Sequence, residues 1–167
     1  MRAHAVELGY IQPDDHGQKH HSVAAYPPDF DREVDMAMRQ RIQEEEFIIL
    51  ESWLAGFFSV GVPEVLRILL YCSDVNVAIQ RVMQRDGLSE EEAVKNVQGR
   101  VEENFTRWAA MYEAEWHEWV VEGGLVKPED KIDFFHPGIY HLAIDTVEHN
   151  QESTLLLALG ALGYQKA

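Results

Sequence analysis

Four arginines in the middle of the chain have a spacing that suits phosphate binding. Arg81 and Arg85 are four residues apart on one face of a predicted helix. Arg100 and Arg107 share a face of the next predicted helix, with Asn104 between them. A guanidinium presents a planar fork of hydrogen-bond donors, so two of them on one helix face can bind a common anion.

Each arginine pair also has a structural interpretation. The first pair can form ion pairs with the acidic run at 90–92, and the second pair can do so with Glu102 and Glu103. Ion pairs on a solvated face would use the same side chains without binding any ligand. The spacing alone leaves both interpretations open.

A second candidate site follows the apolar run Phe47–Leu50. This run is too short for a helix and is rich in β-branched and aromatic residues, which predicts a buried strand of a parallel sheet. Glu51 comes directly after it, and ligands bind such sheets at the carboxyl ends of the strands. The stretch from Glu51 to Gly56, with Trp53 inside it, is therefore a predicted site. The alternative is that Glu51 only caps the following turn.

The remaining pattern predicts an α/β protein. Apolar segments at 65–71 and 140–146 predict two more strands, and the second ends on Asp145, either as a site residue or as a cap of the strand end. Helices are predicted at about 29–46, 74–86, 89–121 and from residue 150 onward. Strands that alternate with helices define a parallel sheet flanked by helices, and 167 residues suit a single domain, 1–167.

Composition excludes several classes of function. The net charge of -15 argues against nucleic acid and membrane surfaces as partners. No apolar run approaches the roughly 20 residues of a membrane span. The single cysteine, Cys72, excludes an internal disulfide and fits a reducing, cytoplasmic location. His16 and His20 lie in a polar stretch that we interpret as a loop and not as a metal site, because no carboxylate or cysteine completes a ligand set.

Several segments resemble the cytidylate kinase-like family of P-loop nucleoside monophosphate kinases. The run VDMAMRQRIQEEEFIILESWLAG resembles its acidic helix, buried strand and Leu-Glu-Gly-Arg-Leu-Ala-Gly-like turn, with Ser52 and Trp53 in place of the Gly and Arg. The segment from Val65 to Tyr112 is similar to the strand, helix and arginine-bearing lid, and IYHLAIDT is similar to the final strand. Together these segments cover roughly residues 29–161.

The resemblance implies a fold, a reaction and roles for residues. It implies a parallel sheet with a helical lid at 74–122, and transfer of the ATP γ-phosphoryl group to CMP or dCMP with Mg²⁺. Arg81 and Arg85 would lie at the near hinge of the lid, and Arg100 and Arg107 would bind phosphates. Asp31 and Asp35 would flank the acceptor nucleotide, and the alternative interpretation is that they belong to a solvated acidic face. Trp53 cannot replace the acceptor-phosphate arginine of the family, but it can stack on a base.

One motif of that family is missing from the sequence. No G-x-x-x-x-G-K-[ST] loop occurs, so we expect the chain to start after the strand and loop that bind ATP. That strand would lie between the predicted strands at 47–50 and 65–71, and its loss would leave exposed edges for a second copy or a partner chain. We therefore predict no phosphotransferase activity for the isolated chain. The alternatives are a non-catalytic nucleotide- or protein-binding module and a structural helical partner built on residues 89–121.

Overall fold

The computed structural model describes residues 29–164 and divides the chain into two compact units, Met1–Ile49 and Leu50–Ala167. In the first unit, α2 (Phe30–Glu44) is the helix predicted at about 29–46. Asp31 and Asp35 on this helix are buried and not solvated. The histidine-rich stretch that we interpreted as a loop lies outside the described residues.

The strand predicted at Phe47–Leu50 does not form in the described part of the chain. Phe47 has a φ of 57°, in the left-handed region that an extended strand excludes. The side chains of Phe47 and Ile49 are fully exposed, at 102% and 97%. The prediction of a buried strand is wrong here because a strand requires a neighbour that pairs with its backbone, and no described strand pairs with this segment.

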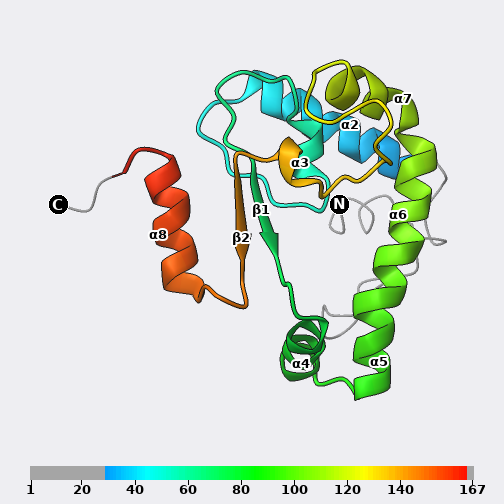
Figure 1. The fold of residues 1–167 in the computed structure, drawn as a ribbon, viewed down its shortest axis with the longest axis vertical. Coiled ribbons are helices and arrows are strands. Elements are labelled where there is room, and N and C mark those ends of the chain that lie inside the picture. The colour runs from blue at the N-terminus through cyan, green and yellow to red at the C-terminus, as the bar shows by residue number, and fades with distance from the viewer. Residues whose placement is uncertain (1–28, 165–167) are drawn as a thin grey trace. The chain divides into compact units, whose positions relative to one another are not determined.

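The second unit contains a two-stranded parallel sheet, formed by β1 (Ile68–Tyr71) and β2 (Leu142–Asp145) (Figure 1). These strands confirm the predictions at 65–71 and 140–146, although both are shorter than predicted. The register pairs Ile68 with Leu142 and Tyr71 with Asp145. The carboxyl ends of the two strands therefore lie side by side, and Asp145 ends one of them.

β1 has a strand neighbour on one edge only within the described residues. Leu142 donates its N–H to Arg67 O, at 3.3 Å, and Thr146 donates to Tyr71 O, at 2.8 Å. In a parallel ladder alternate residues face the neighbouring strand, so the backbone of Leu70 is directed to the opposite edge. The Leu70 side chain is 57% exposed. In the described chain the sheet thus ends at an apolar edge.

A series of helices connects the two strands. The first is α4 (Val75–Asp86), which begins where Asp74 accepts a hydrogen bond from Asn76 N and ends at Gly87, with a φ of 67°. A longer helical run then covers residues 90–121. It comprises α5 (Glu90–Val94), the π-helix η2 (Lys95–Gly99), α6 (Arg100–Met111), α7 (Glu113–Glu115) and the π-helix η3 (Trp116–Val121).

The sequence predicted one continuous helix for this run, and that prediction is correct in part. The run begins with a capping box, in which Ser89 and Glu92 bond each other's backbone N–H groups. It is interrupted at Tyr112, whose φ of -122° and ψ of 23° lie outside the helical region. Figure 1 shows the run along one side of the second unit, with the sheet beside it.

An aromatic core fixes the turn at 50–56 to the far end of the helical run. Phe57 and Phe58 of α3 (Ala55–Phe58) are fully buried, together with Trp116 and Phe134. The Phe57 ring lies 4.8 Å from that of Phe134 and 6.4 Å from that of Trp116, measured between centroids. Aromatic pairs with such geometry contribute about 0.5–1.5 kcal/mol each beyond their burial. The turn is therefore held rigidly relative to the helical run.

Gly56 has a packing role in the same turn. A Cβ atom at this position would overlap the ring of Tyr140, so only glycine allows the ring to approach. Tyr140 follows the short helix η4 (Pro137–Ile139) and donates its hydroxyl hydrogen to Phe134 O, at 2.8 Å. Burial raises the pKa of Tyr140 to about 12. The glycine of the predicted site thus serves the core.

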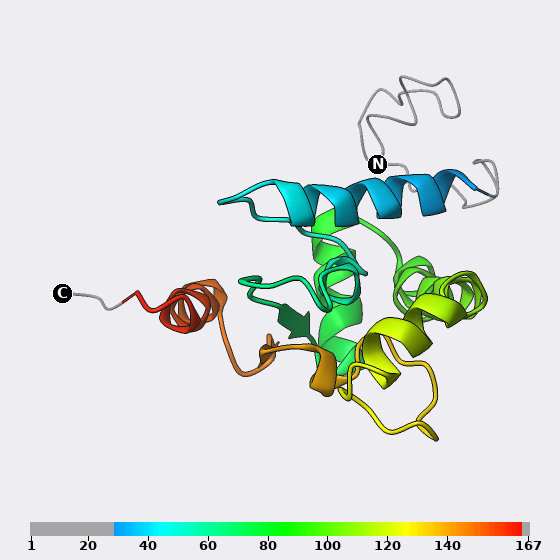
Figure 2. The same cartoon turned by 90° about the horizontal axis from the view of Figure 1, so that it is seen from above.

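The last helix, α8 (Gln151–Ala161), begins with Asn150 as its N-cap and lies beside β2. Figure 2 shows it on the side of the sheet away from the helical run. It has no buried residue, and Leu155 is 57% exposed. Within residues 29–164, no helix combines the length and apolar character that a membrane span requires.

Candidate functional site

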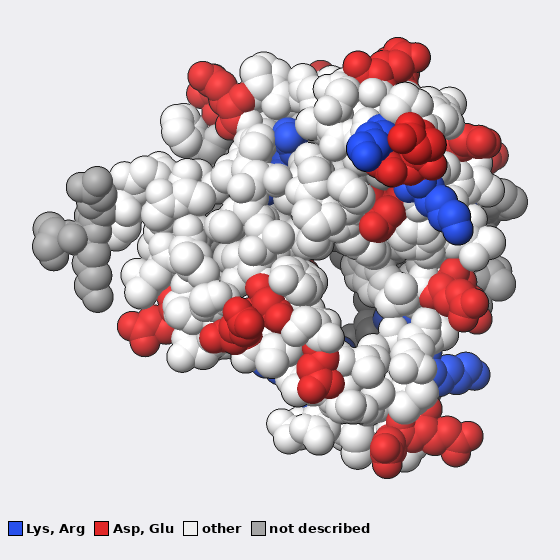
Figure 3. Space-filling model, in the orientation of Figure 1, with Lys and Arg blue, Asp and Glu red and all other residues white. Residues whose placement is uncertain are grey.

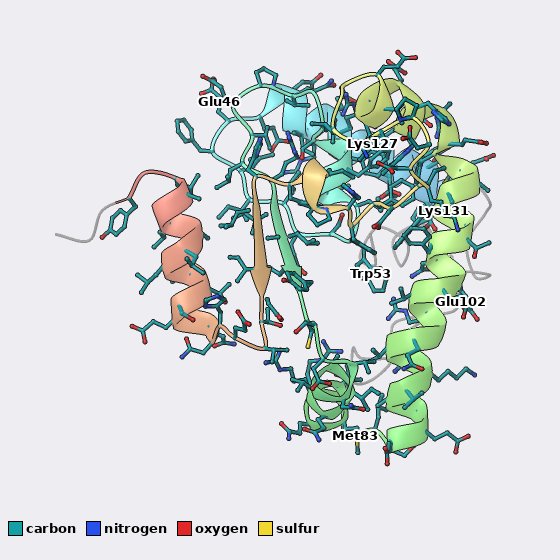
Figure 4. The ribbon with its side chains drawn as sticks, viewed as in Figure 1. Glu46, Trp53, Met83, Glu102, Lys127 and Lys131 are labelled. Carbon is teal, nitrogen blue, oxygen red and sulfur yellow. The ribbon has the colours of Figure 1, made fainter. Side chains whose placement is uncertain are left out.

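The structure brings together two of the predicted site residues, Trp53 and Arg100. Trp53 lies in the turn that precedes α3, and Arg100 is the first residue of α6. The guanidinium carbon of Arg100 is 5.7 Å from the centroid of the Trp53 ring, which is a cation–π contact. Figure 4 shows Trp53 between the sheet and the helical run.

Two further aromatic side chains fix the orientation of Trp53. Trp108 of α6 meets it edge to face with centroids 5.4 Å apart, and Phe135 lies at 6.5 Å. Phe135 is in turn 6.3 Å from Phe105. Trp53 nevertheless remains 41% exposed. The result is an oriented indole with part of its surface open and a positive charge over its ring.

The helix that carries Arg100 follows an irregular segment. The π-helix η2 ends at Gly99, directly before Arg100. Single π-turns inside helices occur frequently at functional sites, because they shift the direction of the side chains that follow. Arg107 lies two turns further along α6, on the face predicted for it.

Arg81 and Arg85, on α4, are used differently. Arg81 donates to the hydroxyl and the carbonyl of Thr146, at 2.8 and 2.7 Å, which ties α4 to the end of β2. Arg85 forms two hydrogen bonds of 2.7 Å with the carboxylate of Asp86, and these bonds raise the pKa of Arg85. Ion pairing with residues 90–92, the predicted structural alternative, is not the contact that either arginine makes here.

Asp145 organises the loops at the carboxyl end of the sheet. It accepts hydrogen bonds from Ser73 N, at 3.1 Å, and from Val147 N, at 3.0 Å. Hydrogen bonding by Ser73 and then by Val147 holds the pKa of Asp145 below its usual value. The carboxylate thus joins the loop after β1 to the loop after β2, which matches the predicted role of a strand-end cap.

The remaining predicted residues and the described surface add little to this site. Glu51 is exposed, and Asp31 and Asp35 belong to the first unit.

Among residues 29–164, no group of three or more His, Cys, Asp or Glu side chains could hold a metal ion. A cavity of about 320 Å³ is lined by residues that include Val60, Arg67 and Trp119, and by none of the predicted site residues. Figure 3 shows acidic side chains spread over one face of the molecule, with few basic ones.

The contact between Trp53 and Arg100 was missed by sequence reasoning. The two residues are far apart in the chain and were assigned separate roles. The only signal in the sequence was that Trp53 stands where the turn it resembles carries an arginine. An arginine, Arg100, occurs instead on a later helix. Contact between the two could not be inferred from spacing.

A small parallel sheet, connected through arginine-bearing helices, places the chain among α/β proteins and is consistent with a kinase-like fold. The profile of the Cytidylate kinase-like family matches residues 25–147, and the chain belongs to this family. It is 26% identical over 147 residues to a cytidylate kinase of Methanopyrus kandleri, and 27% identical over 135 residues to a cytidylate kinase of Methanosarcina barkeri.

These matches cover 84% and 80% of this chain but 66% and 64% of the two relatives. The chain therefore spans about two thirds of the length of the curated relatives that it matches. No solved structure gave a significant match.

Proposed function

We propose that this protein binds a pyrimidine nucleoside monophosphate, CMP or dCMP, at the turn that contains Trp53. The observation that carries this proposal is the guanidinium of Arg100, placed 5.7 Å from the centroid of a partly exposed indole. A nucleotide requires an aromatic or apolar surface for its base and a cation for its phosphate. Both are offered together here, and two curated relatives are cytidylate kinases.

The reaction that we propose for the complete site is phosphoryl transfer from ATP to the bound monophosphate. Such transfer depends on positioning and on neutralising phosphate charge, so arginines such as Arg100 and Arg107 would contribute directly. Mg²⁺ and ATP are the expected cofactor and donor by family membership. The Gly-rich loop that cradles the donor phosphates has no counterpart in residues 1–167. We therefore expect no turnover from these residues alone.

The open edge of β1 supports the proposal of a P-loop fold without its first strand. Ile68 and Leu70 direct backbone groups away from β2, and no described strand pairs with them. A strand bound to this edge would satisfy those groups and cover Leu70. A partner chain or a second copy of this chain would supply such a strand. An oligomer or a partner chain therefore remains a prediction.

A second candidate function is a nucleotide-binding module without catalysis. The specific observation in its favour is that Arg81 and Arg85 are engaged by Thr146 and Asp86. Two of the four arginines predicted for catalysis thus have structural contacts. This candidate has the same monophosphate site as the proposed kinase. It differs only in that no phosphoryl group is transferred under any condition.

Calorimetric titration with CMP and, separately, with Mg-ATP tests the proposal. We expect the chain to bind CMP, and to show no release of ADP when CMP and Mg-ATP are combined. A chain that binds no CMP contradicts the proposed site. Turnover of CMP that disappears in Arg107→Ala contradicts the expectation that residues 1–167 are inactive.

A further inference from the structure

We propose that the cavity at the amino end of the sheet binds a small carboxylate with an apolar body, of the aryl- or alkylcarboxylic acid class. The cavity is walled by the segment 60–63, by Arg67 directly before β1, and by the end of the helical run at Trp119. His141 donates its N–H to Arg67 O, at 3.0 Å, so Arg67 lies where the two strands begin. Figure 1 shows this end of the sheet beside α3 and η4. The site is therefore separate from the proposed monophosphate site.

Arg67 supplies the charge of this site. Its Nε donates a hydrogen bond to Ile139 O, which fixes the side chain beside η4. Among residues 29–164, neither of its Nη groups has an acceptor and no carboxylate pairs with it. The side chain is half-buried, and this burial lowers the pKa of Arg67. A partly desolvated cation without a carboxylate partner is stabilised by an anion that enters the cavity.

The apolar walls of the cavity are preformed. The Trp119 ring lies 5.3 Å from that of Phe57 and 6.1 Å from that of Phe58, measured between centroids, and both phenylalanines are fully buried. Val60 is buried as well. A Cβ at Gly123 would overlap the carbonyl oxygen of Trp119, so glycine is required for the close approach of the chain there. Preformed apolar walls with a few polar groups are typical of sites for small molecules.

The segment 60–63 has an unusual backbone. Gly61 has a φ of 77°, and Glu64, which follows the segment directly, has a φ of 60° although it carries a side chain. Val62 donates its N–H to Ser59 O, at 3.2 Å, which ties the segment to the end of α3. Non-glycine residues in the left-handed region are found preferentially at functional sites, where the surrounding structure holds them. The backbone beside the cavity thus supports a ligand site.

Charge and size select the class of ligand. Arg67 is the only charged side chain among the described residues that line the cavity. One guanidinium can pair with one carboxylate through two N–H groups, whereas a phosphate dianion would keep uncompensated charge between apolar walls. The volume of about 320 Å³ has room for roughly ten groups the size of a water molecule. A monocarboxylate with an apolar body of that size fits both conditions.

The experiment uses 3-phenylpropionate as the probe, with 3-phenylpropionamide as its uncharged counterpart and acetate as a carboxylate without an apolar body. Nitrogen-15 NMR follows the indole N–H signal of Trp119, identified by its loss in Trp119→Phe. We expect 3-phenylpropionate to shift this signal in a saturable way, and the amide and acetate to bind about tenfold more weakly or less. The Trp53 signal should stay in place.

Two variants test the charge and the space separately. Arg67→Gln removes the charge but keeps a side-chain donor, and it should weaken 3-phenylpropionate binding about tenfold or more and amide binding less than about threefold. Val62→Trp fills the cavity and should weaken the binding of both. The matched control is Lys127→Gln, which removes an exposed charge near Leu125 from a residue that does not line the cavity, and it should leave both affinities within about twofold. Thermal unfolding shows which variants are folded.

Four results overturn the inference. They are a Trp119 signal that 3-phenylpropionate does not shift, equal binding of acid and amide, unchanged affinity in Arg67→Gln, and unchanged affinity in a folded Val62→Trp. The comparison of acid with amide uses the unaltered chain, so it tests the charge even if Arg67→Gln does not fold. None of these measurements involves CMP, so failure of this inference and failure of the proposed function are distinguishable.

Discussion

The arginines of α4 and those of α6 have similar spacing but different surroundings. Arg81 is bonded twice to Thr146 at the end of β2, and Arg85 is bonded twice to Asp86. Arg100 lies over the ring of Trp53, at the edge of an aromatic cluster. Residue type and spacing thus indicate a candidate anion site. The contacts that each guanidinium makes indicate whether it has a structural or a ligand-binding role. Arg81 and Arg85 tie parts of the protein together, and Arg100 lies beside an exposed ring where we propose that a nucleotide binds.

The largest effect is expected where the core holds the far end of the helical run against the turn. Phe57→Ala should lower the free energy of unfolding by about 3–5 kcal/mol, because it removes a fully buried ring and leaves a cavity. CMP binding should be lost with it, since Trp53 and Arg100 are positioned by this core. The matched control is Phe47→Ala, which removes a ring that is 102% exposed and should change stability little. Denaturant unfolding of both variants measures the difference.

The next effect concerns the arginine that joins α4 to β2. Arg81→Ala removes two hydrogen bonds to Thr146 and should lower the free energy of unfolding by about 1 kcal/mol. Arg81→Lys keeps the charge but not the two-pronged geometry, so it should recover only part of this loss. If Arg81→Ala left stability unchanged while weakening CMP binding, the assignment of Arg81 to structure would be wrong.

A pH dependence is expected from the carboxylate at the same end of the sheet. The hydrogen bonds from Ser73 and Val147 hold the pKa of Asp145 below its unfolded value. A lowered folded pKa contributes stability above the unfolded pKa of about 4, and this contribution is lost as pH falls through the folded pKa. Asp145→Asn should therefore lower the free energy of unfolding at pH 7. Between pH 5 and pH 2 the variant should lose less stability than the unaltered chain, and the difference should correspond to the protonation of about one carboxyl group. Chemical denaturation across this range measures it, and parallel profiles for the two chains would contradict the assignment.

The smallest effect is expected at Arg85. Its partner Asp86 is adjacent in the chain and the Arg85 side chain is 67% exposed, so the ion pair is solvated. Arg85→Ala should change the free energy of unfolding by about 0.5 kcal/mol or less, and high salt should reduce the effect further. A loss comparable to that of Arg81→Ala would show that exposure does not separate the two arginines.

Much of the fold was predictable because its signals are local. The apolar runs of β1 and β2, the N-cap at Asp74 and the capping box at Ser89 each depend on neighbouring residues. The run Phe47–Leu50 carries an equally clear local signal, yet it forms no strand in the structure. Strand formation also depends on a partner, and a partner cannot be read from the run itself.

The candidate site was predictable only in its residue types. Trp53, Arg100 and the α4 arginines were all nominated, but the cation–π contact and the bonds from Arg81 to Thr146 join residues distant in sequence. The interruption at Tyr112 was missed because the apolar stripe continues through it without a change of period. Tertiary packing decided each of these features, and a single sequence contains no direct record of it.

The most direct test of the account observes the ligand at Trp53. The chain has four tryptophans, so a nitrogen-15 NMR spectrum should contain four indole N–H signals, and Trp53→Phe identifies one of them by its loss. Addition of CMP should shift the Trp53 signal most, with a smaller shift at Trp108, which contacts it at 5.4 Å. CMP binding that leaves the Trp53 signal in place, or a spectrum that CMP does not change at all, would contradict the claim that this turn and Arg100 form the nucleotide site.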